Sequence, residues 1–238
     1  MSKNKRTYEH YRSLGKPVLI IDVGAIEREV TWKIAVNNIT SEGYYGHTDN
    51  LDWDRPKKLG VSLQKNNLND NILIAAQHKK SLQWEGMPSL EDWTVGLIHK
   101  IRKYSDRHIV VRYHPRCPYF IPSQRFKMLI MNKVISNCVL ETPMQIESTY
   151  DAFNIDYSYH AVVNHCSGPG INAVIAGSNV SVDQKSLAYP MSIKLKQIEN
   201  PPRKKNKEKW LVEISHTEYT VDEINNGQWL TRLKNALE

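Results

Sequence analysis

The sequence predicts an α/β protein built on a mainly parallel sheet that helices cover on both faces. Short apolar runs rich in β-branched residues alternate with segments that carry helix caps or helical periodicity. These runs are apolar throughout, as strands are when both faces of a parallel sheet are buried. With 238 residues, 40% hydrophobic and 24% charged, the chain is long enough to bury a sizeable core.

The first half of the chain begins this alternation. The run PVLIIDVG at 17–24 predicts a buried strand that ends at a glycine, and ILIAA at 72–76 predicts a second. Ser89 is a helix N-cap candidate, with Asp92 at the third helical position as a carboxylate form of the capping box. The apolar face of this helix consists of Leu90, Trp93, Leu97, Ile98 and Ile101.

The second half continues the alternation. The remaining strands are predicted at 108–115, 138–141, 160–164 and 179–183. One helix is predicted to start near Ser148, another follows the strand at 160–164 with the sequence GINAVIAG, and Thr220 caps a final helical region. In a parallel sheet of this kind, ligands bind beyond the carboxyl ends of the strands, where the strand order switches.

The loop NHCSGPG at 164–170 is the most suggestive of these strand ends. Its glycines allow close backbone approach, Ser167 offers a hydroxyl, and the next helix directs free N–H groups and its positive dipole end toward a ligand. This chemistry suits a phosphate. A tight strand-to-helix turn needs the same residues, and the sequence leaves both interpretations open.

A second polar strand end lies at Arg112, His114 and Arg116. Alternate residues of an extended segment face the same side, so these three are predicted to converge on one surface and to meet an anion there. The alternative is that Arg112 pairs with a carboxylate and His114 is a satisfied core histidine. Asp183 is predicted either to bind a sugar hydroxyl or to cap the next turn.

The net charge and the cysteine spacing bear on the class of binding partner and on the cellular compartment. A net charge of +7 favours a polyanion, and the positive charge gathers in SKNKR, RPKK, HKK and PRKKNKEK, although each run is also typical of a solvated loop. The cysteines, at 117, 138 and 166, are far apart, which predicts free thiols in a reducing cytoplasm. No membrane-spanning run, metalloprotease motif, Walker loop, nucleophile elbow or zinc-deaminase signature is present.

Several motifs together resemble a known family. They are PVLIIDVGAIEREVTWKIAVNNITSEGYYG, ILIAAQHKKSLQWEGMPSLEDW, HIVVRYHPR, NHCSGPGINAVIAG, SLAYPMS and WLVEISHTEYTVDEINNG, which span nearly the whole chain. This pattern resembles GT-B-type nucleotide-sugar glycosyltransferases, and more closely a group from tailed phages that modify hydroxymethylated DNA bases. The resemblance implies transfer of a sugar, arabinose or glucose, from a UDP-sugar to 5-hydroxymethylcytosine in double-stranded DNA, inside an infected bacterial cell.

The resemblance also implies a lobe division and a donor site. Residues 1–68 would form a reduced N-terminal, acceptor-side lobe, and residues 69–238 the Rossmann-like donor lobe. Ser167, Gly168 and Gly170 would hold the donor diphosphate, and Arg112 and His114 would neutralise the leaving group. The full donor set is Gln77, His78, Arg112, His114, Arg116, Ser167, Gly168, Gly170, Asp183, Ser186 and Tyr189.

The family's catalytic base usually comes from the first lobe. The candidates here are Asp22, Glu27 and Asp49; Asp22 leads because it follows a buried strand, although it could simply order its turn, and Glu27 could pair with Arg28. No DxD motif is present, so no obligatory metal is expected. The predicted DNA-contacting residues are Arg28, Lys33, Tyr44, Tyr45, Arg55, Lys57 and Lys58.

Two other functions stay open. The chain could glycosylate a polysaccharide or a protein, in which case salt-dependent DNA binding would be weak. It could also be a non-catalytic, basic nucleic-acid-binding module with a degenerate nucleotide pocket. Nucleoside diphosphates would stabilise a working donor site and leave such a module unchanged.

Overall fold

The structure, a computed structural model, describes residues 3–117, 120–141 and 155–238. The helix predicted near Ser148 lies outside these residues. The chain forms two compact units: unit 1 combines Met1–Ser62 with Asn206–Glu238, and unit 2 is Leu63–Lys205. No helix in the described ranges has the length and apolar character needed to cross a membrane.

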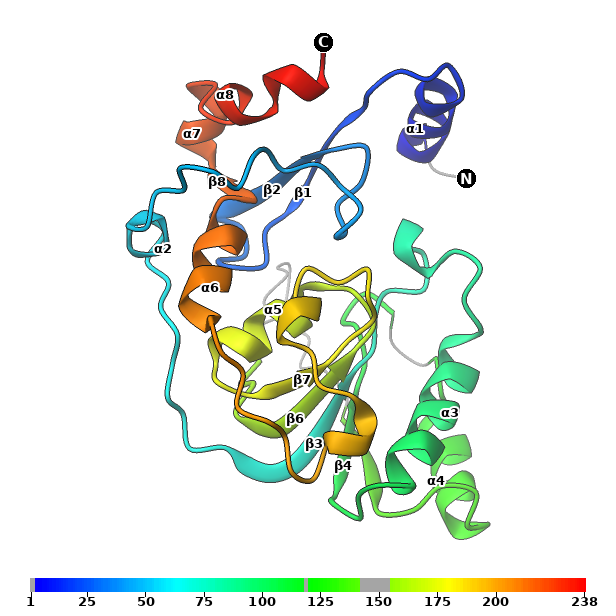
Figure 1. The fold of residues 1–238 in the computed structure, drawn as a ribbon. Helices are drawn as coiled ribbons and strands as arrows, with labels where there is room; N and C mark the ends of the chain where they lie inside the picture. Colours follow the sequence, from blue (N-terminus) through cyan, green and yellow to red (C-terminus); the bar gives the residue numbers. More distant parts are fainter. Residues whose placement is uncertain (1–2, 118–119, 142–154) are drawn as a thin grey trace. The chain divides into compact units, whose positions relative to one another are not determined.

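Unit 2 is built on a five-stranded, wholly parallel sheet (Figure 1). The strands are β3 (Asn69–Ala75), β4 (Ile109–Arg112), β5 (Cys138–Glu141), β6 (Tyr159–Asn164) and β7 (Asn179–Ser181). Their order in the sheet is β5-β4-β3-β6-β7, so the first strand is central, the next two extend to one side and the last two to the other. Numbered along the chain, this order is 3-2-1-4-5, which follows the Rossmann strand order and confirms the predicted α/β class with a parallel sheet.

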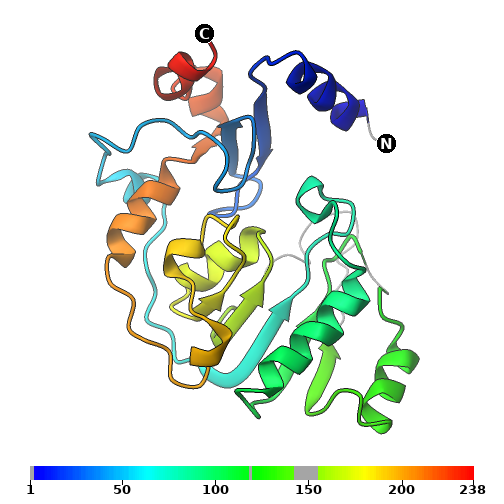
Figure 2. The ribbon, with the colours of Figure 1, turned by 45° about the vertical axis from the view of Figure 1, so that its right-hand side comes forward.

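Helices cover both faces of this sheet (Figure 2). They are α3 (Leu90–Arg102) and α4 (Ser123–Met131) on one face and α5 (Gly168–Ile175) on the other, with short 3-10 turns η1 (Leu82–Trp84), η3 (Tyr189–Met191) and η4 (Leu195–Gln197). On the α3 side, Ile74, Val111 and Val163 pack against Ile98 and Phe126 in one continuous core. Burial of this apolar face holds the sheet and helices together.

The predicted N-cap of α3 is confirmed. Ser89 Oγ accepts a hydrogen bond from the Asp92 N–H at 3.1 Å and donates one to the Asp92 carboxylate at 2.6 Å. One backbone donor, the Asp92 N–H, is thus capped as the sequence pattern indicates, while the Asp92 carboxylate binds the Ser89 hydroxyl where a capping box would use the Ser89 N–H.

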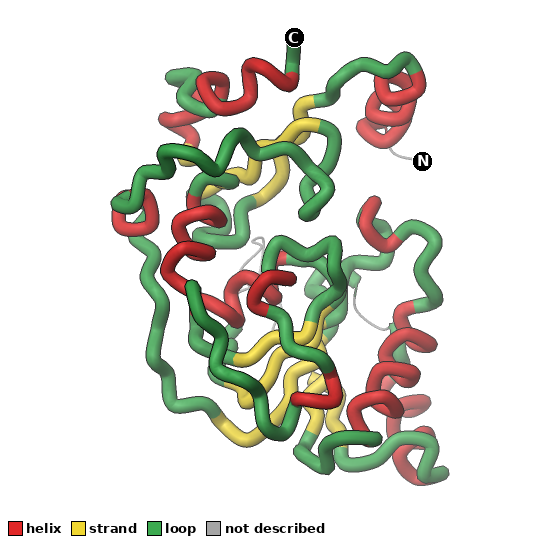
Figure 3. Tube along the Cα trace, viewed as in Figure 1, coloured by secondary structure: helices red, strands yellow, loops and turns green. Residues whose placement is uncertain are grey.

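Unit 1 contains a three-stranded antiparallel sheet in the order β1-β2-β8. Its strands are β1 (Leu19–Val23), β2 (Thr31–Val36) and β8 (Glu218–Thr220); its helices are α1 (Lys3–Ser13), α2 (Arg55–Lys58), α6 (Lys207–Ser215), α7 (Val221–Asn225) and α8 (Leu230–Leu233), followed by the 3-10 turn η5 (Lys234–Ala236). Figure 3 shows the strands of each unit side by side and the long loops that join them to the helices. Ile34, Val36, Tyr219 and Leu233 form the buried core of this unit.

Two features of unit 1 differ from the sequence prediction. The strand at 17–24 was expected in the parallel sheet, but it pairs antiparallel with β2, because the loop at 24–30 turns the chain straight back. The compact units also divide the chain differently from the predicted lobes 1–68 and 69–238. Residues 206–238 join the N-terminal segment because β8 hydrogen-bonds to β2.

Candidate functional site

The strand order of unit 2 switches between β3 and β6, and polar residues gather at this point. Asn164 is the last residue of β6. Its side-chain Nδ2 donates to the carbonyl of Ala75, the last residue of β3, at 2.8 Å. Gln77, two residues beyond β3, has only 3% of its surface exposed. Its side chain donates to Ser81 Oγ at 2.9 Å and accepts from the Cys166 N–H at 3.2 Å. Gln77 therefore fixes the loop after β6 against the loop after β3.

Ser167 is held by the same network. Its N–H donates to Asn164 Oδ1 at 2.9 Å, and its hydroxyl lies 3.0 Å from Asn164 Nδ2, from which it accepts. Ser167 is the N-cap of α5, yet its side chain makes no cap hydrogen bond. Its hydroxyl is thus oriented by Asn164, at the start of the helix where the predicted phosphate would lie.

The glycines at the start of α5 have a packing role. A Cβ at Gly170 would lie 3.0 Å from Val182 Cγ1 and 3.5 Å from Ala188 Cβ, so the missing side chain lets α5 approach the segment after β7. Gly168 is the first residue of the helix. The tight-turn interpretation therefore explains Gly170 by itself, and the phosphate role of Gly168 and Gly170 stays a prediction.

Arg112, the last residue of β4, points away from the α3 face because its neighbour Val111 faces that core. Its side chain is 11% exposed and Nη1 lies 3.6 Å from the carboxylate of Glu141, its pairing partner on β5. Within the described ranges, the buried Arg112 Nε has no hydrogen-bond partner. The carboxylate pairing considered for Arg112 is thus present, but it is long and leaves a donor unsatisfied.

The predicted extended face of Arg112, His114 and Arg116 does not continue as far as Arg116. The strand ends at Arg112, and a turn follows, in which the Cys117 N–H donates to the His114 carbonyl at 2.8 Å. Arg116 lies within this turn and is exposed. The two-residue repeat of a strand therefore ends before Arg116.

The turn instead brings His114 against His78. The two imidazole centroids are 4.8 Å apart in an edge-to-face arrangement. Nδ1 of each ring accepts a backbone N–H, from Lys80 and Arg116 respectively, at 3.1 Å. Burial lowers the pKa of His78, the charges of Arg116, Lys80 and Lys79 lower it further, and the hydrogen bond with the Arg116 backbone opposes them. His78 is therefore neutral at pH 7 and carries its proton on Nε2.

The three predicted residues after β7 occupy different environments. Asp183 Oδ1 accepts from the Lys185 N–H at 3.0 Å, and the Asp183 N–H donates to the His165 carbonyl at 2.9 Å, so Asp183 caps a turn, as its alternative interpretation expected. Ser186 is buried, and Tyr189 is exposed. Of these three side chains, Tyr189 is therefore the one that could stack on a ligand at the surface.

Sequence reasoning did not assign a role to Asn164 or Glu141. Asn164 opens the NHCSGPG loop and joins both sides of the strand switch, whereas Glu141 is the final residue of β5 and the partner of Arg112. Both are strand-end polar residues in the same sheet. Applying the strand-end rule to every predicted strand would have found them.

The candidate bases lie in unit 1. Asp22 is exposed on β1, and its carboxylate accepts from the Val23 N–H at 2.8 Å. In the register of the sheet, Asp22 lies opposite Lys33 on β2, and Lys33, which is 8% exposed, lies opposite Glu218 on β8. Glu27 and Asp49 are exposed loop residues. Of the three candidates, Asp22 is the one that a cation neighbours across the sheet.

Glu218 is the buried acid of this sheet. Its carboxylate is fully buried and accepts hydrogen bonds from the N–H groups of Ala25 and Ile26, at 2.7 and 3.0 Å, and from Thr31 Oγ1 at 2.7 Å. These bonds tie the loop after β1 to β8. Glu218 therefore has a positional role that the sequence did not reveal.

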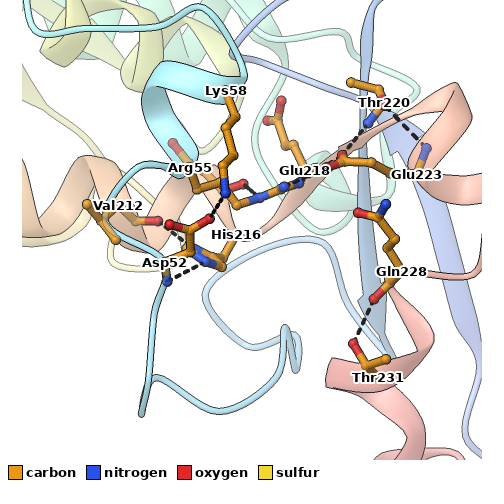
Figure 4. Close-up of polar contacts among 11 residues, drawn as sticks. Asp52, Arg55, Lys58, Val212, His216, Glu218, Thr220, Glu223, Gln228 and Thr231 are labelled. Carbon is orange, nitrogen blue, oxygen red and sulfur yellow. Dashed lines mark hydrogen bonds and ion pairs between the residues drawn. The ribbon is translucent and has the colours of Figure 1, made fainter.

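Arg55 is a structural residue, which corrects its assignment as a DNA contact (Figure 4). Its Nη1 and Nη2 bind the Glu223 carboxylate at 2.6 and 2.9 Å, Nε donates to the Ser215 carbonyl at 2.8 Å, and Nη2 donates to the Glu218 carbonyl at 2.6 Å. Burial would raise the pKa of Glu223, but its hydrogen bonds with Arg55 and the Thr220 backbone hold that pKa below its usual value. All three guanidinium nitrogens of Arg55 are therefore hydrogen-bonded within unit 1.

The other predicted DNA-contacting residues differ in how exposed their side chains are. Lys57 and Lys58 are exposed, and Lys58 forms an ion pair with Asp52 at 2.6 Å. Lys33 is buried. Burial raises the pKa of Tyr45, and the carboxylates of Glu218 and Asp22 raise it further. Tyr44 packs edge-to-face against His47, with centroids 5.9 Å apart, and Arg28 is half-buried. Lys57 and Lys58 are thus the members of this set best placed to meet a phosphate.

The cysteines are free, with Cys117 and Cys138 buried and Cys166 partly exposed at the strand switch. Burial raises the pKa of Cys138 to about 11, so this thiol is protonated at pH 7. In the part of the chain that the structure describes, three or more His, Cys, Asp or Glu side chains nowhere gather as a metal site would require.

A Rossmann strand order in unit 2, together with a second, smaller unit, is consistent with the predicted GT-B-like fold with a reduced N-terminal lobe, although the sheet of that smaller unit is antiparallel. The solved structure of KpsC from Thermosulfurimonas dismutans, beta Kdo 2,7 transferase, is similar over 100% of this chain and 91% of that chain, with a TM-score of 0.51 and 13% identity. The beta Kdo 2,4 transferase of the same organism's KpsC aligns over 96% and 84%, with a TM-score of 0.47 and 10% identity. No family model and no curated protein sequence matches the chain. At this identity the likeness shows the fold.

Proposed function

We propose that this protein is a glycosyltransferase that uses a nucleoside diphosphate sugar, with the donor bound at the carboxyl edge of the parallel sheet of unit 2. The observation that carries the proposal is the set of donors at the carboxyl edge of this sheet: an Arg112 side chain with an unsatisfied Nε, the paired rings of His78 and His114, and the start of α5. Ligands of Rossmann-like sheets bind at this position.

Each donor has a role in the transfer. The leaving diphosphate gains negative charge as the glycosidic bond to it breaks, and a guanidinium stabilises that charge most strongly through paired, charge-assisted hydrogen bonds. Arg112 reaches Glu141 only at 3.6 Å, so a diphosphate can compete for it. The neutral His78 ring adds an Nε2–H donor with the His114 ring beside it, and Asp22 is the leading candidate to accept the proton of the acceptor hydroxyl.

For the acceptor we propose a hydroxymethylated base in DNA, with 5-hydroxymethylcytosine as the specific candidate and a UDP-sugar, carrying arabinose or glucose, as donor. The net charge of +7 and the exposed Lys57 and Lys58 support a polyanionic acceptor. The second candidate is a glycan or protein acceptor. The observation in its favour is that the similar solved structure is named as a Kdo transferase.

The donor claim is tested by a thermal melt of the full chain with a panel of nucleoside diphosphates. A bound diphosphate should raise Tm as its concentration rises, and Arg112→Ala should abolish the response. Arg125→Ala is the matched control, because Arg125 is an exposed arginine of the same unit that pairs with Glu91. Glu141→Gln should keep or strengthen the response because it frees the Arg112 guanidinium. An unchanged response in Arg112→Ala would refute this donor site.

The acceptor claim is tested separately by intact-mass analysis. Hydroxymethylated duplex DNA should gain the mass of one sugar per modified base when enzyme and the best donor are supplied. Labelling of a glycan with unchanged DNA mass would assign the second candidate. A chain that binds DNA but responds to no nucleotide would instead be the non-catalytic binding module.

A further inference from the structure

A hollow of about 360 Å³ lies at the opposite edge of unit 2 from the proposed donor site. It is formed where the C-terminal end of α3 meets η4, near the edge at which the parallel strands begin (Figures 1 and 2). Its lining residues are Lys100, Lys103, Tyr104, Lys194, Leu195 and Lys196. We call it the lysine hollow. Its volume falls within the range of small-ligand sites, ~300–1,000 Å³.

The backbone of the lysine hollow is fixed on both sides. Leu195 packs against the same core as α3, and Gln197 closes the η4 turn by accepting the Lys194 N–H at 3.0 Å while its own N–H donates to the Lys194 carbonyl at 2.8 Å. Lys100 and Lys103 are three residues apart, so they lie on one side of the helix end. The four ammonium groups are thus presented by rigid elements.

Among the described residues, the lysines of the lysine hollow form no ion pair with a carboxylate. Asp70 and Glu199, which lie at the same edge of unit 2, are both bound to Arg107, at 3.0 and 3.1 Å. The dipole of α3 favours lysines at its C-terminal end, but it does not account for Lys194 and Lys196, which come from another element.

We propose that the lysine hollow is a second binding site, which takes the phosphates of a nucleotide and holds its base against Tyr104. The Tyr104 ring is 47% exposed at the rim, where an unpaired base can stack on it, and lysines bind phosphate as mobile point charges. The nucleotide is either free or part of a single strand. This site goes beyond the donor site and does not depend on it, because no residue is shared.

The test measures binding of a fluorescein-labelled oligothymidylate to the full chain by anisotropy. Lys100→Glu with Lys196→Glu should weaken binding at least tenfold. The control double variant, Lys65→Glu with Lys127→Glu, changes two exposed lysines of the same unit by the same charge and should change the Kd less than twofold. In the double variant Lys100→Ala with Lys196→Ala, the magnitude of the slope of log K against log salt should fall by about 1.4, or ~0.7 per lost phosphate contact.

Tyr104 and a competitor complete the test. Tyr104→Ala should weaken binding several-fold and Tyr104→Phe should restore it, because stacking needs the ring and not the hydroxyl. Displacement of the strand by adenosine monophosphate identifies a free nucleotide as ligand, and binding without displacement identifies the strand. Equal weakening in the control double variant, or no effect of the hollow variants, overturns the proposal. Arg112→Ala should leave strand binding unchanged, so failure of this site is distinguishable from failure of the donor site.

Discussion

At the scale of single residues, the difference between a surface charge and a buried one decides what an arginine or lysine does. Arg55 and Lys57 lie two positions apart in the same basic run, RPKK. Arg55 makes its hydrogen bonds with residues 160 to 168 positions away in the chain, while Lys57 stays exposed. The sequence shows the run but not the distant partners, so it cannot separate the two.

This contrast gives a stability prediction. Arg55→Ala should lower the free energy of unfolding by about 3 kcal/mol, because it leaves the Glu223 carboxylate and two backbone carbonyls without their buried partner. Lys57→Ala should change it by less than about 0.5 kcal/mol. Urea denaturation monitored by circular dichroism measures both. Similar small losses in the two variants would contradict the structural role of Arg55.

Local signals at this scale were predicted well. Ser89 with Asp92, and Thr220 with Glu223, both form the expected caps, since a cap involves only residues three positions apart. Arg112 shows the limit of such reasoning. Its residue type and strand end were foreseen, but its pairing with Glu141 depends on the order of strands in the sheet.

At the scale of elements, the cores of the parallel strands were predicted, but several strand ends were not. The run at 138–141 matches β5 fully, whereas the run at 108–115 ends early as β4 at Arg112. β2 carries Lys33 and Thr31 in its middle and start, so it lacks the uniform apolar pattern, and β8 has three residues. The sequence does not predict β2 or β8, because hydrogen bonding to neighbouring strands, and not their composition, makes these segments strands.

The end of α5 gives the prediction at this scale. Gly177 follows the helix with φ of 93°, and a Cβ there would lie 2.9 Å from the Gln64 carbonyl oxygen. Gly177→Ala should therefore cost about 2–4 kcal/mol of stability, from the left-handed backbone and the steric overlap.

Gly96 is the matched control for this change. It lies within α3 with nothing within 4 Å of its would-be Cβ, so Gly96→Ala should stabilise the protein by about 0.5–1 kcal/mol. Thermal or urea unfolding of the two variants should show shifts of opposite sign. Shifts of the same sign would mean that the environment of Gly177 is not as described.

At the scale of the whole molecule, the chain leaves unit 1 after residue 62 and returns at residue 206. Unit 1 is therefore discontinuous, while unit 2 is one uninterrupted segment. Sequence periodicity predicts elements in order along the chain, and it cannot reveal that the last strand pairs with the second. The lobe boundary predicted at 68 lies within the polar stretch QKNNLNDN at 64–71, but the placement of 206–238 required the three-dimensional pairing of β8.

Deletion of residues 206–238 tests this organisation. Without β8 and α6, amide protons of Thr31–Val36 should lose their protection from hydrogen exchange, because β2 loses one neighbouring strand and the core loses Tyr219 and Leu233. Protection in β3 and β6 should persist, since their partners lie within 63–205. Mass-spectrometric exchange resolves these peptides. Retained protection in β2, or loss throughout, would contradict the division into units.

The pairing of β8 with β2 also sets an order of events on the ribosome. The first 62 residues emerge early but wait for the final segment, and during that time one edge of the β1–β2 hairpin has no partner. Unit 2 can close as soon as residue 205 clears the exit tunnel. Until β8 emerges, the nascent N-terminal hairpin exposes the edge of β2 that β8 later covers, and this edge is open to pairing with a strand of another chain.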